Sequence, residues 1–145
     1  MADTIYDIEK IRGFFTGDRY LMLTGIRIDA VGEDAAALSF DIADMHYNAG
    51  GVVQGGAIYT LADSAFAVAS NAAHIARGEK KITVSQSASI SYLRPARGAR
   101  LIANASKISG GNRISVYSIE VTDELGTKVA HMTGNAYTVE LKERT

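Results

Sequence analysis

Cysteine is absent from all 145 residues, which excludes a thiol nucleophile, a disulfide bond and a cysteine-ligated metal site. The chain also has no excess of basic residues, since it contains 15 Lys and Arg and 16 Asp and Glu. Nucleic-acid binding favours a clear positive charge. The start, MADTIYDIEKIRGFF, carries acids where a signal peptide needs a basic end and an apolar run. No apolar run is long and pure enough to span a bilayer, since Asp63 and Asn71 interrupt the Ala-rich one. These absences predict a soluble, cytoplasmic protein that binds neither nucleic acid nor membrane.

The composition that remains is typical of a folded globular protein. Apolar residues make up 47% of the chain and charged residues 21%, which distinguishes it from disordered sequences. A chain of this length can bury a core of ordinary size. No internal repeat, low-complexity tract or linker divides it, so we expect one domain over residues 1–145.

The first third of the chain is predicted to hold three short elements. Apolar residues recur at helical spacing from Ile5 onward, which predicts an N-terminal helix over residues 3–16, with Asp3 or Thr4 near its cap. Two strands are expected around the polar turn AVGED, over residues 21–28 and 35–42.

A long buried helix is predicted after a loop at residues 46–53. Apolar positions between residues 54 and 76 fall on one helical face, and Gly78 follows the last turn as a helix stop. A helix of about 22 residues is roughly 33 Å long.

After Lys80 the pattern changes from helical to alternating. The stretches ITVSQSASISYL, ARLIANASKI, ISVYSIEVT and KVAHMTGNAYTVEL are separated by turn signals at RPARG, SGGNR and DELG. They predict a four-stranded antiparallel meander. With the two earlier strands, the pattern favours an α+β fold in which a curved, antiparallel six-stranded sheet wraps the long helix.

Residues 46–66, HYNAGGVVQGGAIYTLADSAF, have the composition of a ligand site. Two Gly-Gly pairs would let a ligand reach backbone N–H groups at the start of the helix, where the helix dipole favours negative charge. Asp63 follows as a lone acid on the Ala-rich helix and is a candidate base.

The pattern HYNAGGVVQGGAIYTLADSAFAVASN, followed by SQSASISYLRPA, resembles the hotdog-fold acyl-CoA thioesterases, in particular their PaaI-like branch of phenylacetate metabolism. The Gly-Gly pair, the Leu-x-Asp of the helix and the Tyr-Leu-x-Pro-Ala strand end occur in the family's order. The resemblance spans nearly the whole chain. It implies a hotdog fold, in which a curved sheet wraps one long helix.

The resemblance also implies roles for four residues in catalysis. Asp63 corresponds to the catalytic acid, which acts either as base toward water or as nucleophile on the thioester carbonyl. Gly55 corresponds to the residue whose backbone N–H polarises that carbonyl. Asn48 corresponds to a side chain that places the thioester or the water, and Ser85 to a hydroxyl that orients the water.

Coenzyme A would be held at the start of the helix and at the ends of the strands. By the same resemblance, the residues expected to bind the substrate are Gly56, Tyr92, Leu93, Arg94, Pro95, Arg97 and Arg113. The basic residues Arg94, Arg97, Arg100, Lys107 and Arg113 surround the strand ends, where guanidinium groups would suit phosphates.

Gln54 is the one clear departure from the family, which usually has His at this position. In relatives that side chain is thought to help position or polarise the substrate. Gln keeps a hydrogen-bond donor and an acceptor but does not titrate. Because the oxyanion donor is a backbone group, this substitution leaves it in place.

Each candidate also has a simpler structural explanation. Asp63 could be a solvated acid on a helix, Asn48 a turn residue, and Ser85 one of several serines on an alternating strand. Gly55 and Gly56 could serve close packing, and the basic residues a solvated surface.

The spacing of Gly55 and Asp63 places a constraint on the site that does not depend on the family. The two residues lie eight positions apart on one helix, or roughly 12 Å, so one carbonyl cannot contact both. The site is therefore expected to combine Gly55 of one chain with Asp63 of another. This requires at least a homodimer, and we expect a homotetramer.

Three histidines, His46, His74 and His131, show no metal-ligand spacing. We expect no metal and no cofactor, since coenzyme A is part of the substrate. His74 is interpreted as a helix-surface residue and His131 as structural.

Hydrolysis of an acyl-CoA thioester, with an aryl-acetyl or medium-chain acyl group, is the leading function. One alternative is a non-catalytic acyl-CoA binding module, but such regulators usually carry a DNA-binding segment, and no helix-turn-helix precedes Leu21. Another is a hotdog dehydratase or hydratase, which Gln54 and the lack of a His beside Asp63 disfavour. The acyl group, the pairing of dimers and the choice between base and nucleophile stay open.

Overall fold

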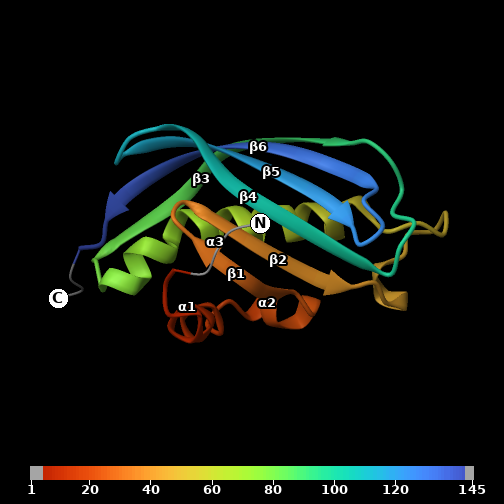
Figure 1. Cartoon of the computed structure of the whole chain (residues 1–145), viewed down its shortest axis with the longest axis horizontal. Coiled ribbons are helices and arrows are strands. Elements are labelled where there is room, and N and C mark those ends of the chain that lie inside the picture. The colour runs from red at the N-terminus through yellow and green to blue at the C-terminus, as the bar shows by residue number, and fades with distance from the viewer. Residues whose placement is uncertain (1–4, 143–145) are drawn as a thin grey trace.

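A curved, antiparallel six-stranded sheet wraps around one long helix in the computed structural model, which describes residues 5–142 (Figure 1). The strand order is β1-β2-β4-β5-β6-β3. The predicted α+β architecture is confirmed. The strands are β1 Arg27–Gly32, β2 Ala35–Asp41, β3 Lys81–Tyr92, β4 Arg100–Gly110, β5 Ile114–Asp123 and β6 Lys128–Glu140.

The central helix, α3, runs from Gly55 to Arg77 and confirms the predicted helix to within one residue at each end. The Gln54 side chain caps its start, and Gly78 ends it in the left-handed conformation, with φ 64°. No helix within residues 5–142 is long and apolar enough to cross a membrane.

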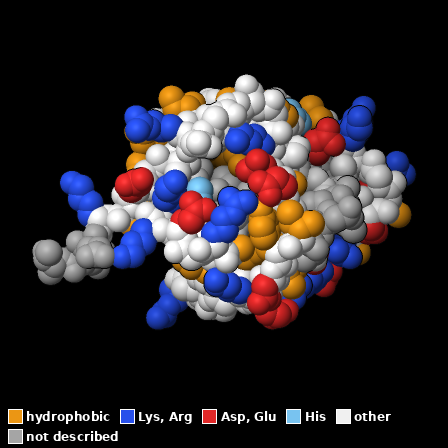
Figure 2. All heavy atoms as spheres, turned by 60° about the vertical axis from the view of Figure 1, so that its left-hand side comes forward, with side chains coloured by type: hydrophobic (Ala, Val, Ile, Leu, Met, Phe, Trp, Pro, Cys, Tyr) orange, Lys and Arg blue, Asp and Glu red, His pale blue; other side chains and the backbone are white. Residues whose placement is uncertain are grey.

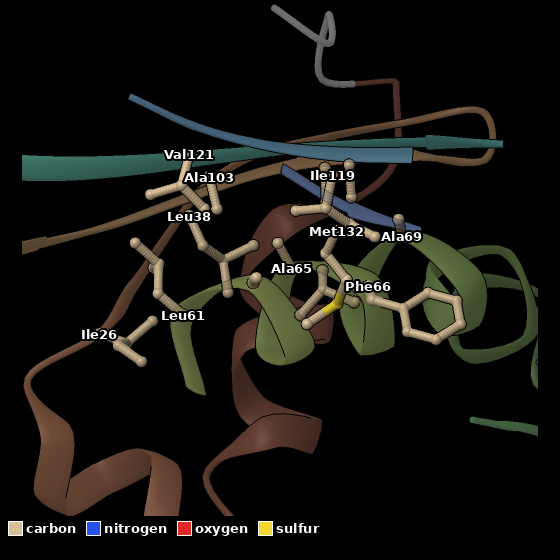
Figure 3. Packing of buried hydrophobic residues seen from close by; sticks show 14 of the residues in the cluster. Ile26, Leu38, Leu61, Ala65, Phe66, Ala69, Ala103, Ile119, Val121 and Met132 are labelled. Atoms are coloured by element: carbon tan, nitrogen blue, oxygen red, sulfur yellow. The ribbon is translucent and has the colours of Figure 1, made fainter. Parts of the chain in front are cut away.

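Small side chains on α3 let the sheet pack closely against it. Ala65 and Ala69 are almost fully buried, and Figure 3 shows them, with Leu61 and Phe66, on the side of the helix that faces the sheet. A Cβ on Gly134 of β6 would lie 2.7 Å from the Phe66 ring. Glycine at this position therefore makes room for the largest side chain on this face of the helix.

The N-terminal helix is shorter than predicted. Helix α1 spans Ile8–Phe15, and Asp7 caps it by accepting hydrogen bonds from the N–H groups of Glu9 and Lys10. The expected caps, Asp3 and Thr4, lie outside the described residues.

The strand predicted over residues 21–28 is wrong. Residues Arg19–Thr24 form a short helix, α2, whose start is capped by Asp18 and whose end is set by Gly25 at φ 77°. Strand β1 begins only at Arg27 and continues to Gly32, so the turn is confined to Glu33 and Asp34. An element of six residues is too short for apolar periodicity to distinguish helix from strand.

The predicted four-stranded meander is also wrong in one respect. Strands β4, β5 and β6 form a meander, but β3 pairs with β6 along the opposite edge and is not paired with β4. An alternating pattern defines which face of a strand is buried but not which strand lies beside it.

Strand β3 therefore forms an edge of the sheet. It is 12 residues long, and most of its side chains are exposed. From Ile82 to Tyr92 it carries no charged side chain. Natural edge strands are commonly protected by charges, by proline or by being short. A long, uncharged edge is suited to pairing with another strand.

Candidate active site

The loop before α3 folds back on itself and leads directly into the start of the helix. The N–H of Gln54 donates to the carbonyl of His46 (2.7 Å), and the N–H of Asn48 donates to the carbonyl of Val52 (2.7 Å). At Gly51, φ is 83°, which favours glycine. The predicted loop at residues 46–53 is confirmed, and these bonds fix where α3 begins.

Two backbone N–H groups at the start of α3 are free. Of the first three helical residues, only Ala57 has its N–H bonded, to the carbonyl and the side chain of Gln54. Within residues 5–142, the N–H groups of Gly55 and Gly56 have no partner. Free N–H groups at the positive end of a 23-residue helix can bind a developing negative charge.

Gln54 and Gly56 depend on each other. The Gln54 Oε1 accepts the Ala57 N–H at 3.1 Å, and a Cβ on Gly56 would lie 2.6 Å from that oxygen. A side chain at position 56 would thus displace Gln54 from its cap. Since Oε1 is used by the helix, Nε2 is the part of the amide left for a ligand.

Asp63 lies on the third turn of α3 and is partly buried. Burial raises the pKa of its carboxyl group, and the negative charge of Asp18 raises this pKa further. The carboxylate has no hydrogen bond or ion pair among the described residues. A poorly solvated, unpaired carboxylate is a better base than an ordinary surface Asp.

The N–H of Gly55 and the carboxylate of Asp63 lie at different positions along and around α3, as the sequence predicts. Both belong to the same unbroken helix. They are separated by roughly 12 Å along the helix axis and by about 80° around it. The structure therefore does not bring them together within one chain.

Asn48 holds the loop through its side-chain oxygen. Its Oδ1 accepts the N–H groups of Gly50 (2.9 Å) and Val52 (3.2 Å). This is the turn role that the simpler explanation gives it. Its Nδ2 makes no bond within the described part of the chain, so the amide nitrogen can still donate to a ligand.

Tyr92, at the end of β3, does lie against Gly55. Its hydroxyl donates to the Gly55 carbonyl at 3.1 Å, and its ring would be 3.3 Å from a Cβ at that position. Ser85 is exposed on the same strand. It lies seven residues away from Tyr92, which is roughly 23 Å in a strand, so one protomer does not bring Ser85 to Gly55.

The candidate residues for coenzyme A fall into two groups. Leu93, Arg94, Pro95 and Arg97 are exposed on the β3–β4 loop beside Tyr92. Arg113 is exposed in the β4–β5 turn, at the other end of β4. An 11-residue strand spans roughly 36 Å, so Arg113 does not join the others within one protomer.

Two of the other basic residues are engaged with their own chain. Arg100 donates to Ser39 at 3.2 Å and pairs with Asp29, and Lys107 pairs with Asp34. Figure 2 views the molecule from the end where α3 finishes and shows Lys and Arg mixed with Asp and Glu. The face in that view carries no patch of purely positive charge.

A cavity of about 320 Å³ opens beside the start of α3. The sequence did not identify it, because its walls come from α2, β2, the loop before α3 and the first turns of α3 itself. The exposed aromatic and apolar residues on α2 were the only feature that could have indicated this cavity. The lining residues are Tyr20, Thr24, Ile26, Phe40, Met45, His46, Gln54, Gly56, Ala57 and Thr60.

The histidines serve the fold in this structure. His46 Nδ1 accepts the N–H of Ala43 (2.9 Å), and the ring stacks on Phe40. His131 bonds Ser118 (2.8 Å), and His74, which is partly buried rather than on the surface, bonds Thr83 (3.1 Å). Among residues 5–142, no three His, Asp or Glu side chains gather where they could share a metal ion.

A comparison by sequence and a comparison by structure both find that this chain is similar to the PaaI protein of Escherichia coli. The family described as "Thioesterase superfamily" matches residues 50–130, which include Gly55, Asp63, Ser85 and Tyr92. A putative esterase of Archaeoglobus fulgidus is 31% identical, over 91% of this chain and 83% of that protein. The acyl-coenzyme A thioesterase PaaI of Escherichia coli is 26% identical, over 90% of each chain. The solved structure of the E. coli PaaI protein superposes with a TM-score of 0.81 at 24% identity, covering 92% of this chain and 95% of that one.

Proposed function

The chain belongs to the thioesterase superfamily and has its hotdog fold, and from this premise we propose that it hydrolyses acyl-CoA thioesters, with aryl-acetyl or medium-chain acyl groups as substrates. The observation that carries the proposal is the pair of free N–H groups at the start of α3. The relatives named esterase and acyl-coenzyme A thioesterase support the same reaction.

In the proposed reaction the thioester oxygen accepts the N–H of Gly55, whose dipole stabilises the oxyanion as it forms. Asp63 of the partner subunit takes a proton from water while the water oxygen adds to the carbonyl carbon. The C–S bond then breaks, and the thiolate takes up the proton to leave as free coenzyme A. Alternatively, the carboxylate itself adds to the carbonyl carbon, and the C–S bond breaks to release the thiolate of coenzyme A. Water then hydrolyses the resulting mixed anhydride, which frees the acyl group as an acid, regenerates Asp63 and supplies the proton that the thiolate takes up. Both versions need Asp63 ionised.

A dimer formed along β3 would complete this site. Two copies of β3 pairing antiparallel about a twofold axis would extend the sheet, and their α3 helices would lie antiparallel beneath it. The start of one helix would then lie beside the middle of the other. The long, uncharged edge of β3 and the unpaired carboxylate of Asp63 support this arrangement. The homotetramer stays a prediction.

The same dimer would join the two groups of coenzyme A residues. Antiparallel pairing places the end of β3 at Tyr92, with Arg94 just beyond it, near the partner's opposite end, where Arg113 lies. It would also carry Ser85 toward the partner's helix. Asn48 Nδ2 and Gln54 Nε2, which have no partner among residues 5–142, would be available there as side-chain donors to the thioester.

Several expectations from the sequence stay predictions. These are the single domain over residues 1–145, the cytoplasmic location, the absence of a metal and of a cofactor beyond the coenzyme A of the substrate, and the absence of a nucleic-acid partner.

Release of free thiol from a panel of acyl-CoA substrates tests the proposed function directly. We expect turnover of phenylacetyl-CoA and hexanoyl-CoA, measured with a thiol reagent. Tight binding of these compounds without any thiol release would contradict hydrolysis and favour the non-catalytic acyl-CoA binding module.

The pH dependence of kcat/KM should show a single acidic limb from Asp63. Because burial and then Asp18 raise the pKa of this carboxyl group, activity should rise with pH and reach half its maximum above the usual Asp value of about 3.9. Gln54 cannot titrate, so position 54 should add no limb near pH 6.5.

Asp18→Asn is the matched variant, because Asn still caps α2 but carries no charge. It should shift the limb to lower pH. A limb that stays unchanged in Asp18→Asn and also in Asp63→Asn would rule out Asp63 as its source.

A further inference from the structure

The β3–β4 loop, residues 93–99, carries several of the residues expected to bind coenzyme A, yet it contains no helix or strand of its own. Its start is held to β6, because the N–H of Leu93 donates to the carbonyl of Val129 (2.8 Å). Pro95, the only proline of the chain, fixes one backbone angle within it. The end of the loop lies beside the turn between β5 and β6 (Figure 1), and a pair of acids makes the contact.

Asp123, the first of these acids, ties the loop to the turn. It is almost fully buried, at 2% exposed. Its Oδ2 accepts the N–H groups of Arg97 (2.8 Å) and Gly98 (3.0 Å), and its Oδ1 accepts those of Leu125 (3.0 Å) and Thr127 (2.9 Å) in its own turn. Burial acts to raise the pKa of this carboxyl group, but the hydrogen bonds outweigh burial and hold the pKa below the usual Asp value. The carboxylate therefore stays ionised and bonded at neutral pH.

Glu124, the second acid, holds the next two N–H groups of the same segment. Its Oε1 accepts the N–H of Ala99, and its Oε2 accepts that of Arg100 (2.8 Å). The bond from Ala99, above the others, lowers the pKa of Glu124. A Cβ on Gly98 would overlap this carboxylate, so glycine at position 98 lets Glu124 approach the loop. Two consecutive acids thus bind the backbone N–H groups of residues 97–100, as converging N–H groups bind an anion.

This arrangement leaves the guanidinium groups of Arg94 and Arg97 free. Both residues are exposed, and neither side chain has a hydrogen bond or an ion pair among residues 5–142. The two acids do not neutralise them, because each of the four carboxylate oxygens accepts a backbone N–H instead. Arginine binds phosphate through paired N–H donors in a fixed geometry. A loop that is already ordered loses less conformational entropy when it binds a ligand.

We propose that Asp123 and Glu124 are positioning residues for the substrate, which fix the backbone of residues 97–100 so that Arg94 and Arg97 are presented to the phosphate groups of coenzyme A. This rests on the proposed function. The acids act through the loop and not on the thioester. Their loss should therefore weaken binding of the nucleotide part of the substrate and leave the chemical step unchanged.

Glu124→Ala frees two N–H groups of the segment without disturbing the core, because Glu124 is exposed. In the full-length protein, the Kd of free coenzyme A, measured by calorimetry, should rise about three- to tenfold. The KM of hexanoyl-CoA should rise with it, and kcat should stay within about twofold. Glu124→Gln, which keeps one acceptor oxygen, should give an intermediate Kd. An unchanged or lower Kd in Glu124→Ala would overturn the proposal.

The direction of the change separates positioning from charge. Removing a negative charge near a phosphate would by itself tighten binding, whereas loss of the loop contacts weakens it. Glu120→Ala is the matched control, because Glu120 is an exposed acid of β5 with no bond to the loop. The Kd of coenzyme A in this variant should stay within about twofold of the native value. A rise as large as that in Glu124→Ala would contradict the role of the loop.

A substrate without the nucleotide tests whether the effect is confined to the phosphates. The hexanoyl thioester of N-acetylcysteamine has the same acyl group and the same reacting bond but no phosphate. Its kcat/KM should change by less than about twofold in Glu124→Ala. An equal loss on this thioester and on hexanoyl-CoA would show that the acids shape the thioester site, which would overturn the proposal.

Gly98→Ala disturbs the same contact from the loop side. It should raise the Kd of coenzyme A as Glu124→Ala does, because the new Cβ displaces the Glu124 carboxylate. In the Glu124→Ala background, the same change should add less than about twofold, because the carboxylate is no longer there. Fully additive effects of the two substitutions would contradict the contact as their common cause.

The two proposals fail in different ways. Absence of thiol release from every acyl-CoA contradicts the proposed function, and a raised Kd for coenzyme A in these variants would then still support the role of the loop. Turnover together with a native Kd in both Glu124→Ala and Gly98→Ala contradicts the positioning role alone.

Discussion

Asp63→Asn should lower kcat on every acyl-CoA substrate by at least about 10²–10⁴-fold, the contribution typical of a general base. Asn has nearly the same shape as Asp but takes no proton and does not add to a carbonyl carbon. The partly buried Asp63 carboxylate, with a raised pKa and no internal partner, is the only acid on α3. Steady-state thiol release measures the effect.

The fold should survive this substitution and gain slightly in stability. Burial raises the pKa of Asp63, which means that the ionised form is the less favourable one in the folded protein. A neutral amide removes that cost near pH 7, so the melting temperature should be equal or higher. Lost activity at undiminished stability is the pattern expected of a functional residue.

Asp41→Asn is the matched control. Asp41 is exposed and pairs with Arg27 at 2.9 Å, and an exposed ion pair contributes little to stability. Activity in this variant should be unchanged. Full activity in Asp63→Asn would refute both versions of the mechanism, whereas a large loss in Asp41→Asn would show that the assay responds to general perturbation.

Gly55→Pro should lower kcat by about 10²–10³-fold, the loss typical of removing one oxyanion donor. Proline lacks the N–H but is well accepted at the first position of a helix. Gln54 already has the extended conformation, with ψ 135°, that a residue before proline requires. The loss should therefore be chemical and not a consequence of misfolding.

Gly55→Ala separates the N–H from the space at this position. Alanine keeps the N–H and adds the same Cβ, which would meet the Tyr92 ring at 3.3 Å. Because Tyr92 is half exposed, its ring can shift. We expect Gly55→Ala to stay within about tenfold of the native rate. Equal losses in both variants would mean that crowding against Tyr92, and not the N–H, explains the effect.

Mixing Gly55→Pro with Asp63→Asn tests whether the site is shared between two chains. Each hybrid dimer would have one intact site, formed by Gly55 of one chain and Asp63 of the other. After random exchange of equal amounts, about a quarter of the native activity should return. No recovery, with subunit exchange proven by mass spectrometry or by tagged copies, would contradict the shared site.

Local signals in the sequence were sufficient for the elements that carry the chemistry. Helix α3 was predicted to within a residue at both ends, because an apolar face of many turns and a glycine stop are encoded in neighbouring residues. The position of Gly55 at the start of the helix and that of Asp63 two turns later follow from it. The helix spacing alone also shows that the two residues cannot act on one carbonyl from one chain.

Tertiary structure determined which residues surround Gly55 and Asp63. Residues 19–24 form a helix and not a strand in the packed chain, and the same segment provides Tyr20 and Thr24 to the cavity. That β3 lies at the edge beside β6, and not beside β4, is a choice of partner which alternation does not encode. Caps and periodicity are properties of adjacent residues, whereas a pocket wall and a strand neighbour are formed by residues far apart in the chain, and only their packing determines them.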